Sequence, residues 1–310
     1  MAAPVAIRSQ YTDLFGSTML PVLEELFRAE MALHPSLRER LFKVVTTDRD
    51  IYQVSELHDM PLYSQVSEGQ DYTFSRPRQG ANKTLTISKF GLGFSISEEA
   101  VDDGKFDLIG DMVRRLARSG YETQMVNSMN VINNGFGTQT TADGVSLFNT
   151  AHTLPSGQTF RNQLSTNADL SVTSLETMLS DFETQFVGDT GIIYRIRPRV
   201  LLVHPNLRRY ALELVGSEYK ADTADNNTNP FKDDGLMVYS DPHLTDTDFF
   251  GVFALPEETG LRIVVRKPIE TKAAGPDVGF NSDSIYYKSR FREAIDCTHA
   301  YGVFASPGAP

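Results

Sequence analysis

The 310-residue sequence contains a single cysteine, Cys297. One cysteine excludes an internal disulfide and is typical of a protein made in a reducing compartment. No stretch approaches the ~20 consecutive apolar residues that a membrane-spanning helix needs. Residues 1–16 also lack the apolar core of a secretory signal peptide. We therefore expect a soluble protein that is intracellular when it is made.

The chain also lacks a run of basic residues, and its net charge is −11. The densest basic region holds Arg195, Arg197 and Arg199, with Arg208 and Arg209 close behind. Alternating arginines of this kind favour a solvated strand face or salt bridges between subunits over contacts with nucleic acid. Sequence-specific DNA binding is therefore not expected.

Motifs of catalysis are missing as well. The six histidines are scattered, and the sequence has neither HExxH nor the paired cysteines of a zinc site nor a GxSxG elbow. The glycine pairs at 91 and 93 and at 135 and 137 lack the third glycine and the Lys-Ser/Thr of phosphate-binding loops. We expect no catalytic site, no metal and no cofactor, and hence no enzyme.

Three small groupings keep an alternative open. Asp241 and His243 are two residues apart, His152 lies among hydroxyl side chains, and Cys297 precedes His299 by two residues. A turn explains the first grouping, and a small buried thiol explains the third. The alternative is a hydrolase that uses Asp241, His243 or His152 with a metal.

Residues 106–133 have the pattern of one helix, about 42 Å long at ~1.5 Å per residue. Ile109, Val113 and Leu116 fall on one stripe of this helix. Gly110 and Gly120 each cost a helix ~1 kcal/mol relative to alanine, which predicts close packing or a bend there. Two ordinary helices separated at Gly120 are the alternative.

Residues 51–96 instead follow a β pattern, in which Tyr72 and Phe74 alternate with polar residues. A one-residue slip of the apolar phase beside Gly91 predicts a β-bulge, and Glu68-Gly69 predicts a turn. This long, polar hairpin needs a partner surface, because an isolated hairpin is marginally stable in water.

At 310 residues the chain exceeds what one hydrophobic core usually serves, so two subdomains are expected. Before the hairpin, a helix capped at Ser17 or Thr18 has one apolar face that would dock on a neighbour, in the same chain or another. After residue 133 we expect a long polar loop at 135–171, helices at 173–187 and 207–215, and strands at 200–203, 236–239, 249–254, 261–265 and 284–296.

Five segments stand out in order along the chain: Phe94–Gly104, Ala142–His152, Arg199–Pro205, Tyr286–Arg292 and Tyr301–Ser306. Together they resemble the major capsid proteins of tailed bacteriophages, and within them the Mu-type major head subunits. Each is a weak motif, and their order and spacing carry the resemblance over roughly residues 50–308.

The resemblance implies an α+β chain with the Hong Kong 97-like capsid fold. It divides the chain into an N-terminal arm (1–50), an extended hairpin loop (51–95), a peripheral domain (96–189) with the spine helix 106–133, an axial domain (190–262), and the return strands of the peripheral domain (263–310).

It further implies a major capsid protein that self-assembles into hexamers and pentamers, forming an icosahedral phage head around double-stranded DNA in the host bacterial cytoplasm. The implied partners are other copies of the chain, a separate scaffolding protein, a portal protein, possible decoration proteins and DNA held without sequence-specific contact, with no membrane. Candidate contacts between subunits are Glu68, Arg76, Arg78, Lys83, Leu23 and Phe27. An encapsulin-type compartment, with the same fold around enzyme cargo, is the alternative.

Overall fold

The computed structural model describes residues 20–33, 37–76, 78–97, 99, 103, 106–218, 229–274 and 284–309. The expected helix cap at residues 17–18 lies outside them. The chain forms two compact units, as its length predicts. The first is built from the described parts of Met1–Ser36, Ile87–Val126 and Val265–Ala294, and the second from those of Leu37–Thr86, Asn127–Val264 and Ile295–Pro310.

The first unit contains the long helix α5 (Phe106–Asn133), which has the bounds expected from the sequence and continues past Val126 into the second unit. The same unit contains α2 (Leu20–Leu33) and the long strands β4 (Ser88–Ser97), β10 (Leu261–Ala274) and β11 (Ser284–Cys297). The sheet order is β1-β10-β11-β4, where β1 is Lys43–Thr46. Strand β10 extends nine residues beyond the predicted end at residue 265, and β1 was not predicted.

Both helices of this unit contribute to one core with the sheet. Leu23 and Phe27 from α2 pack with Ile109 and Val113 of α5 and with Tyr287 of β11. The apolar face of α2 thus docks within its own chain, which decides between the two possibilities left open by the sequence.

The two glycines of α5, Gly110 and Gly120, differ in how closely other residues pack against them. A Cβ on Gly120 would lie 2.7 Å from Cδ1 of Ile269, so the predicted close packing is confirmed there. A Cβ on Gly110 would meet only Cδ1 of Leu26, at an ordinary 3.8 Å. Because α5 is continuous across both positions, the alternative of two separate helices is wrong.

The strand pattern before α5 requires two corrections. Strand β4 pairs antiparallel with β11 in constant register, from Ser284 opposite Ser97 to Glu293 opposite Ser88, so the predicted bulge beside Gly91 is wrong. The apolar phase slips because Ile87 separates two strands that belong to different sheets. The expected hairpin therefore ends at Thr86, where β3 (Gln79–Thr86) completes its pairing with β2 (Ile51–Leu57).

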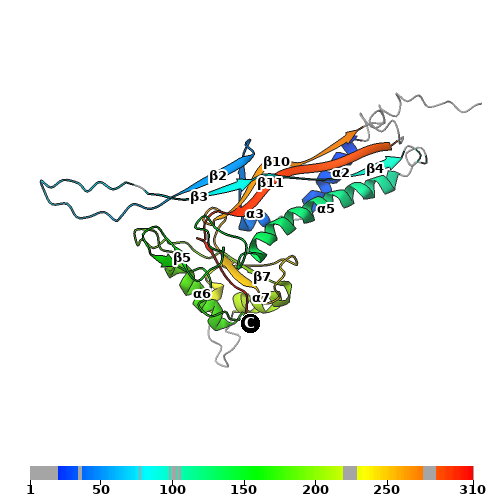
Figure 1. The fold of residues 1–310 in the computed structure, drawn as a ribbon. Coiled ribbons are helices and arrows are strands. Elements are labelled where there is room, and N and C mark those ends of the chain that lie inside the picture. Colours follow the sequence, from blue (N-terminus) through cyan, green and yellow to red (C-terminus); the bar gives the residue numbers. More distant parts are fainter. Residues whose placement is uncertain are drawn as a thin grey trace, which may run out of the picture. The chain divides into compact units, whose positions relative to one another are not determined.

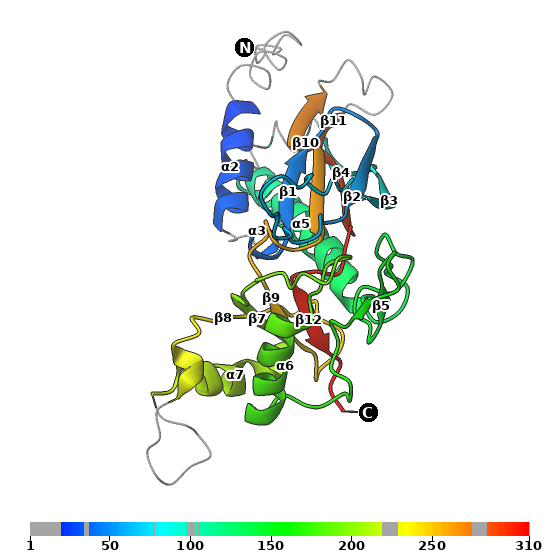
Figure 2. The same ribbon diagram turned by 90° about the vertical axis from the view of Figure 1, so that its left-hand side faces the viewer.

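The second unit is built on a sheet of order β12-β9-β7-β8. Its strands are β7 (Val200–Val203), β8 (Met237–Ser240), β9 (Phe250–Phe253) and β12 (Val303–Ser306), and all residues of β7, β9 and β12 are buried. Strands β7 and β8 are parallel. The chain between them forms η2 (Pro205–Leu207), α7 (Arg208–Gly216) and η3 (Pro230–Lys232) (Figure 2).

Helix α6 (Val172–Thr184) packs into the same core through Leu175, Met178 and Phe182. Its cap is Ser171, whose hydroxyl accepts from the Ser174 amide in a capping box. The predicted caps, Thr173 and Ser174, are already inside the helix. The long loop before α6 contains only the short strands β5 (His152–Thr153) and β6 (Thr159–Phe160), and a short helix α3 (Arg38–Leu41) precedes β1.

Candidate functional site: the extended loop and its base

The described residues between β2 and β3, 58–76 and 78, form a long loop, here called the extended loop. Figure 1 shows it running outward from the ribbon of these two strands and returning. The tip is a turn in which the Gln70 amide donates to the Ser67 carbonyl at 3.1 Å, and Gly69 has φ 83°. The predicted turn at Glu68-Gly69 is therefore confirmed. Glycine suits this position because it adopts the left-handed conformation without steric cost. The strand expected around Tyr72 and Phe74 is wrong, since both lie in irregular backbone.

Large apolar side chains of the extended loop are exposed. Leu62 is 78% exposed, Phe74 is 93% exposed, and Tyr63 and Tyr72 are also on the surface. Apolar residues gathered on one exposed segment mark an interaction site. Leu62 and Tyr63 were not singled out from the sequence; the available signal was their position in an otherwise polar loop.

Hydrogen bonds and ion pairs fix the loop at its base. The His58 amide donates to the Arg78 carbonyl at 2.9 Å, which closes the loop. The Arg78 guanidinium lies 3.8 Å from Asp189, and the Asp189 carboxylate accepts from the Ser156 amide at 2.7 Å. Nearby, the Lys83 ammonium donates to the Thr140 carbonyl at 2.7 Å. The free part of the extended loop therefore begins beyond these contacts.

Ionisable side chains also gather at this base, around a cavity of about 220 Å³. Glu56 lines it, and burial, with the nearby charge of Asp143, raises the pKa of Glu56 to about 7. Although burial acts to raise the pKa of Asp143, hydrogen bonds from His152 and Thr141 hold it below its ordinary value. His152 Nδ1 lies 2.7 Å from Asp143, and its Nε2 lies 3.1 Å from Asn162. His152 is thus held between two polar partners.

The other groupings singled out in the sequence have structural explanations. Burial and the Asp296 charge raise the pKa of Cys297 to about 12, so its thiol is protonated and inert as a nucleophile. Burial, with the Arg262 charge, lowers the pKa of His299 to about 4. His243 Nδ1 lies 2.8 Å from Asp241 within a turn. Within the described ranges, no three His, Cys, Asp or Glu side chains are arranged to hold a metal ion.

The six candidate contact residues fall into two groups. Glu68, Arg76 and Arg78 are exposed on the extended loop, where another subunit could reach them. Lys83 is only 18% exposed and lies 3.5 Å from Asp296 of its own chain. Leu23 and Phe27 are buried in the core of the first unit, so the structure corrects their assignment as contacts with another subunit.

Among the helices that the structure describes, none is long and apolar enough to cross a membrane.

Comparison with solved structures gives the fold. The chain is similar to the structure of Microbacterium phage Oxtober96, at 14% identity and TM-score 0.55, over 88% of this chain and 91% of the other. The bacteriophage PhiM1 mature capsid matches at 14% identity and TM-score 0.57, over 88% and 87% of the two chains. A virus-like particle from Pyrococcus furiosus matches at 13% identity and TM-score 0.57, over 93% and 99%. These matches confirm the expected α+β, Hong Kong 97-like fold.

Comparison with protein-family models shows which family the chain belongs to. No curated protein matches the sequence. The family model described as phage capsid protein matches residues 81–306, from β3 to the end of β12. That range includes α5, the strands β4, β10 and β11, and the whole β12-β9-β7-β8 sheet. The chain therefore belongs to the phage capsid protein family.

Proposed function

We propose that this chain is the major capsid protein of a tailed phage, which self-assembles into hexamers and pentamers and forms an icosahedral head around double-stranded DNA. The observation that carries the proposal is the extended loop, which exposes large apolar side chains beyond its fixed base. Such a segment is costly in an isolated subunit and becomes favourable when a neighbouring copy covers it.

The apolar side chains provide the energy for such a contact. Burying Leu62, Tyr63, Tyr72 and Phe74 against another subunit would contribute on the order of 6–12 kcal/mol, at ~1.5–3 kcal/mol for each side chain. Part of this offsets the cost of association and of ordering the loop. The charged residues Glu68, Arg76 and Arg78 would then lie at the rim, where they affect register more than affinity.

The domain names implied by the family resemblance belong to this proposal. Residues 1–50 would be the N-terminal arm, 51–95 the extended hairpin loop, 96–189 the peripheral domain with α5 as its spine, 190–262 the axial domain, and 263–310 the return strands. The long, continuous α5 and the exposed loop support this assignment. The Mu-type subfamily is a further part of the proposal.

The proposed partners follow from the same role, which is structural and not catalytic. They are other copies of this chain, a separate scaffolding protein, a portal protein and decoration proteins. Assembly would occur in the host bacterial cytoplasm, and the assembled chain would reside in the virion.

Electron microscopy and sedimentation of the purified protein, alone and with a scaffolding protein, test the assembly. The variant Tyr63→Ser/Phe74→Ser should keep its urea unfolding midpoint and fail to form closed shells. Leu212→Ser, which alters a half-exposed apolar residue on α7, is the matched control and should assemble. Closed shells of the loop variant at normal yield, or a wild-type protein that remains a monomer in all conditions, would contradict the proposal.

A second candidate is the shell of a protein compartment with enzyme cargo. Similarity to the Pyrococcus furiosus virus-like particle over 93% of this chain favours it. Purified particles separate the two functions, because a phage head contains packaged DNA whereas a cargo compartment contains a copurifying protein.

A further inference from the structure

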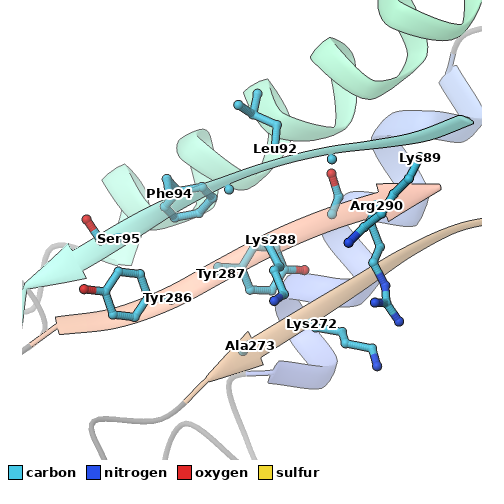
Figure 3. A pocket seen from close by; sticks show the side chains of 13 residues that line it. Lys89, Leu92, Phe94, Ser95, Lys272, Ala273, Tyr286, Tyr287, Lys288 and Arg290 are labelled. Atoms are coloured by element: carbon cyan, nitrogen blue, oxygen red, sulfur yellow. The ribbon is translucent and has the colours of Figure 1, made fainter. Parts of the chain in front are cut away.

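One face of the β10-β11-β4 sheet in the first unit is basic. Helices α2 and α5 contribute to the core with the sheet, and the open face carries Lys89 from β4, Lys272 from β10, and Lys288 and Arg290 from β11. Figure 3 shows these four side chains leaving the strands on the same side, with Leu92 directed the opposite way. We call this surface, defined by the four cationic residues, the basic face. It surrounds an open concavity of about 1080 Å³, and none of the described residues that line it is acidic.

Glycines on the edge strand make room for these side chains. The register places Gly93 opposite Lys288 and Gly91 opposite Arg290. A Cβ on Gly93 would lie 2.8 Å from the Lys288 Cβ, closer than two such atoms can approach, so only glycine fits beside that lysine. The glycine pair that fails as a phosphate-binding loop in the sequence therefore helps to shape a cationic surface in the fold.

Among the residues that the structure describes, most of the positive charge of the basic face has no bound carboxylate. Glu270 is bound to Arg290 at 2.6 Å, and this hydrogen bond, against a small opposing effect of burial, holds the pKa of Glu270 below its ordinary value. One carboxylate thus offsets one of four cations. Lys89, Lys272 and Lys288 remain exposed on a chain whose net charge is −11.

We propose that the basic face binds the phosphodiester backbone of double-stranded DNA. Lys288 and Arg290, two residues apart on one strand, are separated by ~6.8 Å along it. Duplex DNA carries one negative charge per ~1.7 Å of axis, so a duplex lying across the basic face brings phosphates within reach of cations spaced this closely. Contacts of this kind position DNA without reading its sequence, which agrees with the absence of a recognition motif.

A second copy of the extended loop fits this face less well. Residues 58–78 carry three carboxylates, Asp59, Glu68 and Asp71, and two arginines, Arg76 and Arg78. The loop is therefore almost neutral, whereas the basic face has three cations in excess. Charge complementarity favours the duplex. This inference rests on the proposed function, in which the shell encloses double-stranded DNA, and adds which face of the subunit contacts it. DNA binding by the unassembled subunit is measured separately from shell formation.

The test is fluorescence anisotropy of a labelled duplex of mixed sequence, titrated with the unassembled subunit at several salt concentrations. The variant Lys272→Ala/Lys288→Ala should bind at least about fivefold more weakly, and the slope of log affinity against log salt should fall by about 2. Arg195→Ala/Arg197→Ala removes the same charge from the second unit and should leave the affinity and slope unchanged. Lys272→Arg/Lys288→Arg should retain binding, because the positive charges remain.

Shell assembly of the same variants, followed by sedimentation, completes the test. Equal loss of DNA affinity in both alanine variants would overturn the proposal, because it would show a general charge effect. No binding by the wild-type subunit at low salt would also overturn it. A basic-face variant with unchanged DNA affinity and failed assembly would show instead that this face contacts another protein chain.

Discussion

The substitution Glu56→Gln tests the electrostatics at the base of the extended loop. Burial and the Asp143 charge raise the pKa of Glu56 from 4.5 to about 7 in the folded chain. Between these two values the folded state holds a proton that the unfolded state has released. The free energy of unfolding contributed by Glu56 therefore falls as the pH rises from about 4.5 to about 7, and the full penalty is present above that window.

The size of the effect follows from the same two pKa values. The charged Glu56 costs the fold about 3 kcal/mol at pH 8 and only about 0.4 kcal/mol at pH 4.5, since each unit of pKa change is worth ~1.36 kcal/mol. Glutamine carries no charge at either pH. Glu56→Gln should thus raise the free energy of unfolding by up to about 3 kcal/mol at pH 8, with little change at pH 4.5.

Urea unfolding of the unassembled subunit at the two pH values measures this difference. Glu68→Gln, at the exposed tip of the extended loop, is the matched control and should change stability little at either pH. An equal effect of Glu56→Gln at pH 4.5 and pH 8, or destabilisation at pH 8, would refute the reasoning, because either result means that the Glu56 charge is not penalised by the fold.

Three further substitutions test the packing and capping of the subunit by its thermal or urea unfolding. Gly110→Ala should stabilise by about 0.5–1 kcal/mol, because alanine favours the helix and its Cβ meets only an ordinary contact; destabilisation would show a clash that the structure does not contain. Ser171→Ala should cost about 1 kcal/mol through loss of the cap on the Ser174 amide, whereas Ser171→Asp should retain most of that stability. Gly260→Ala should cost about 3 kcal/mol, since its Cβ would lie 1.8 Å from the carbonyl oxygen of His299, and a neutral result would mean that this backbone approach is looser.

Several elements could be predicted because their signals are local. The apolar stripe of α5 repeats over all 28 residues, and the strand at 200–203 is a short run of buried aliphatic residues bounded by a turn signal. The turn at Glu68-Gly69 follows from the conformational freedom of glycine. Such periodicities and steric rules depend only on near neighbours in the chain.

The errors arose where distant segments decide the outcome. The phase slip after Ile87 was a real signal, but both a bulge and a change of sheet produce it, and only the pairing of β4 with β11 distinguishes them. Leu23 and Phe27 form an apolar face in either case, and what covers it depends on α5 and β11.

The sequence by itself determined the long helix, the loop that needs a partner, the absence of catalytic motifs and the resemblance to phage capsid proteins. Only the tertiary structure decided which charged residues act together. Glu56 gains its raised pKa from burial and from Asp143, which is distant in sequence. The basic face assembles Lys89, Lys272 and Lys288 from three strands. Electrostatic effects depend on distance in space and on burial, and a linear order of residues specifies neither.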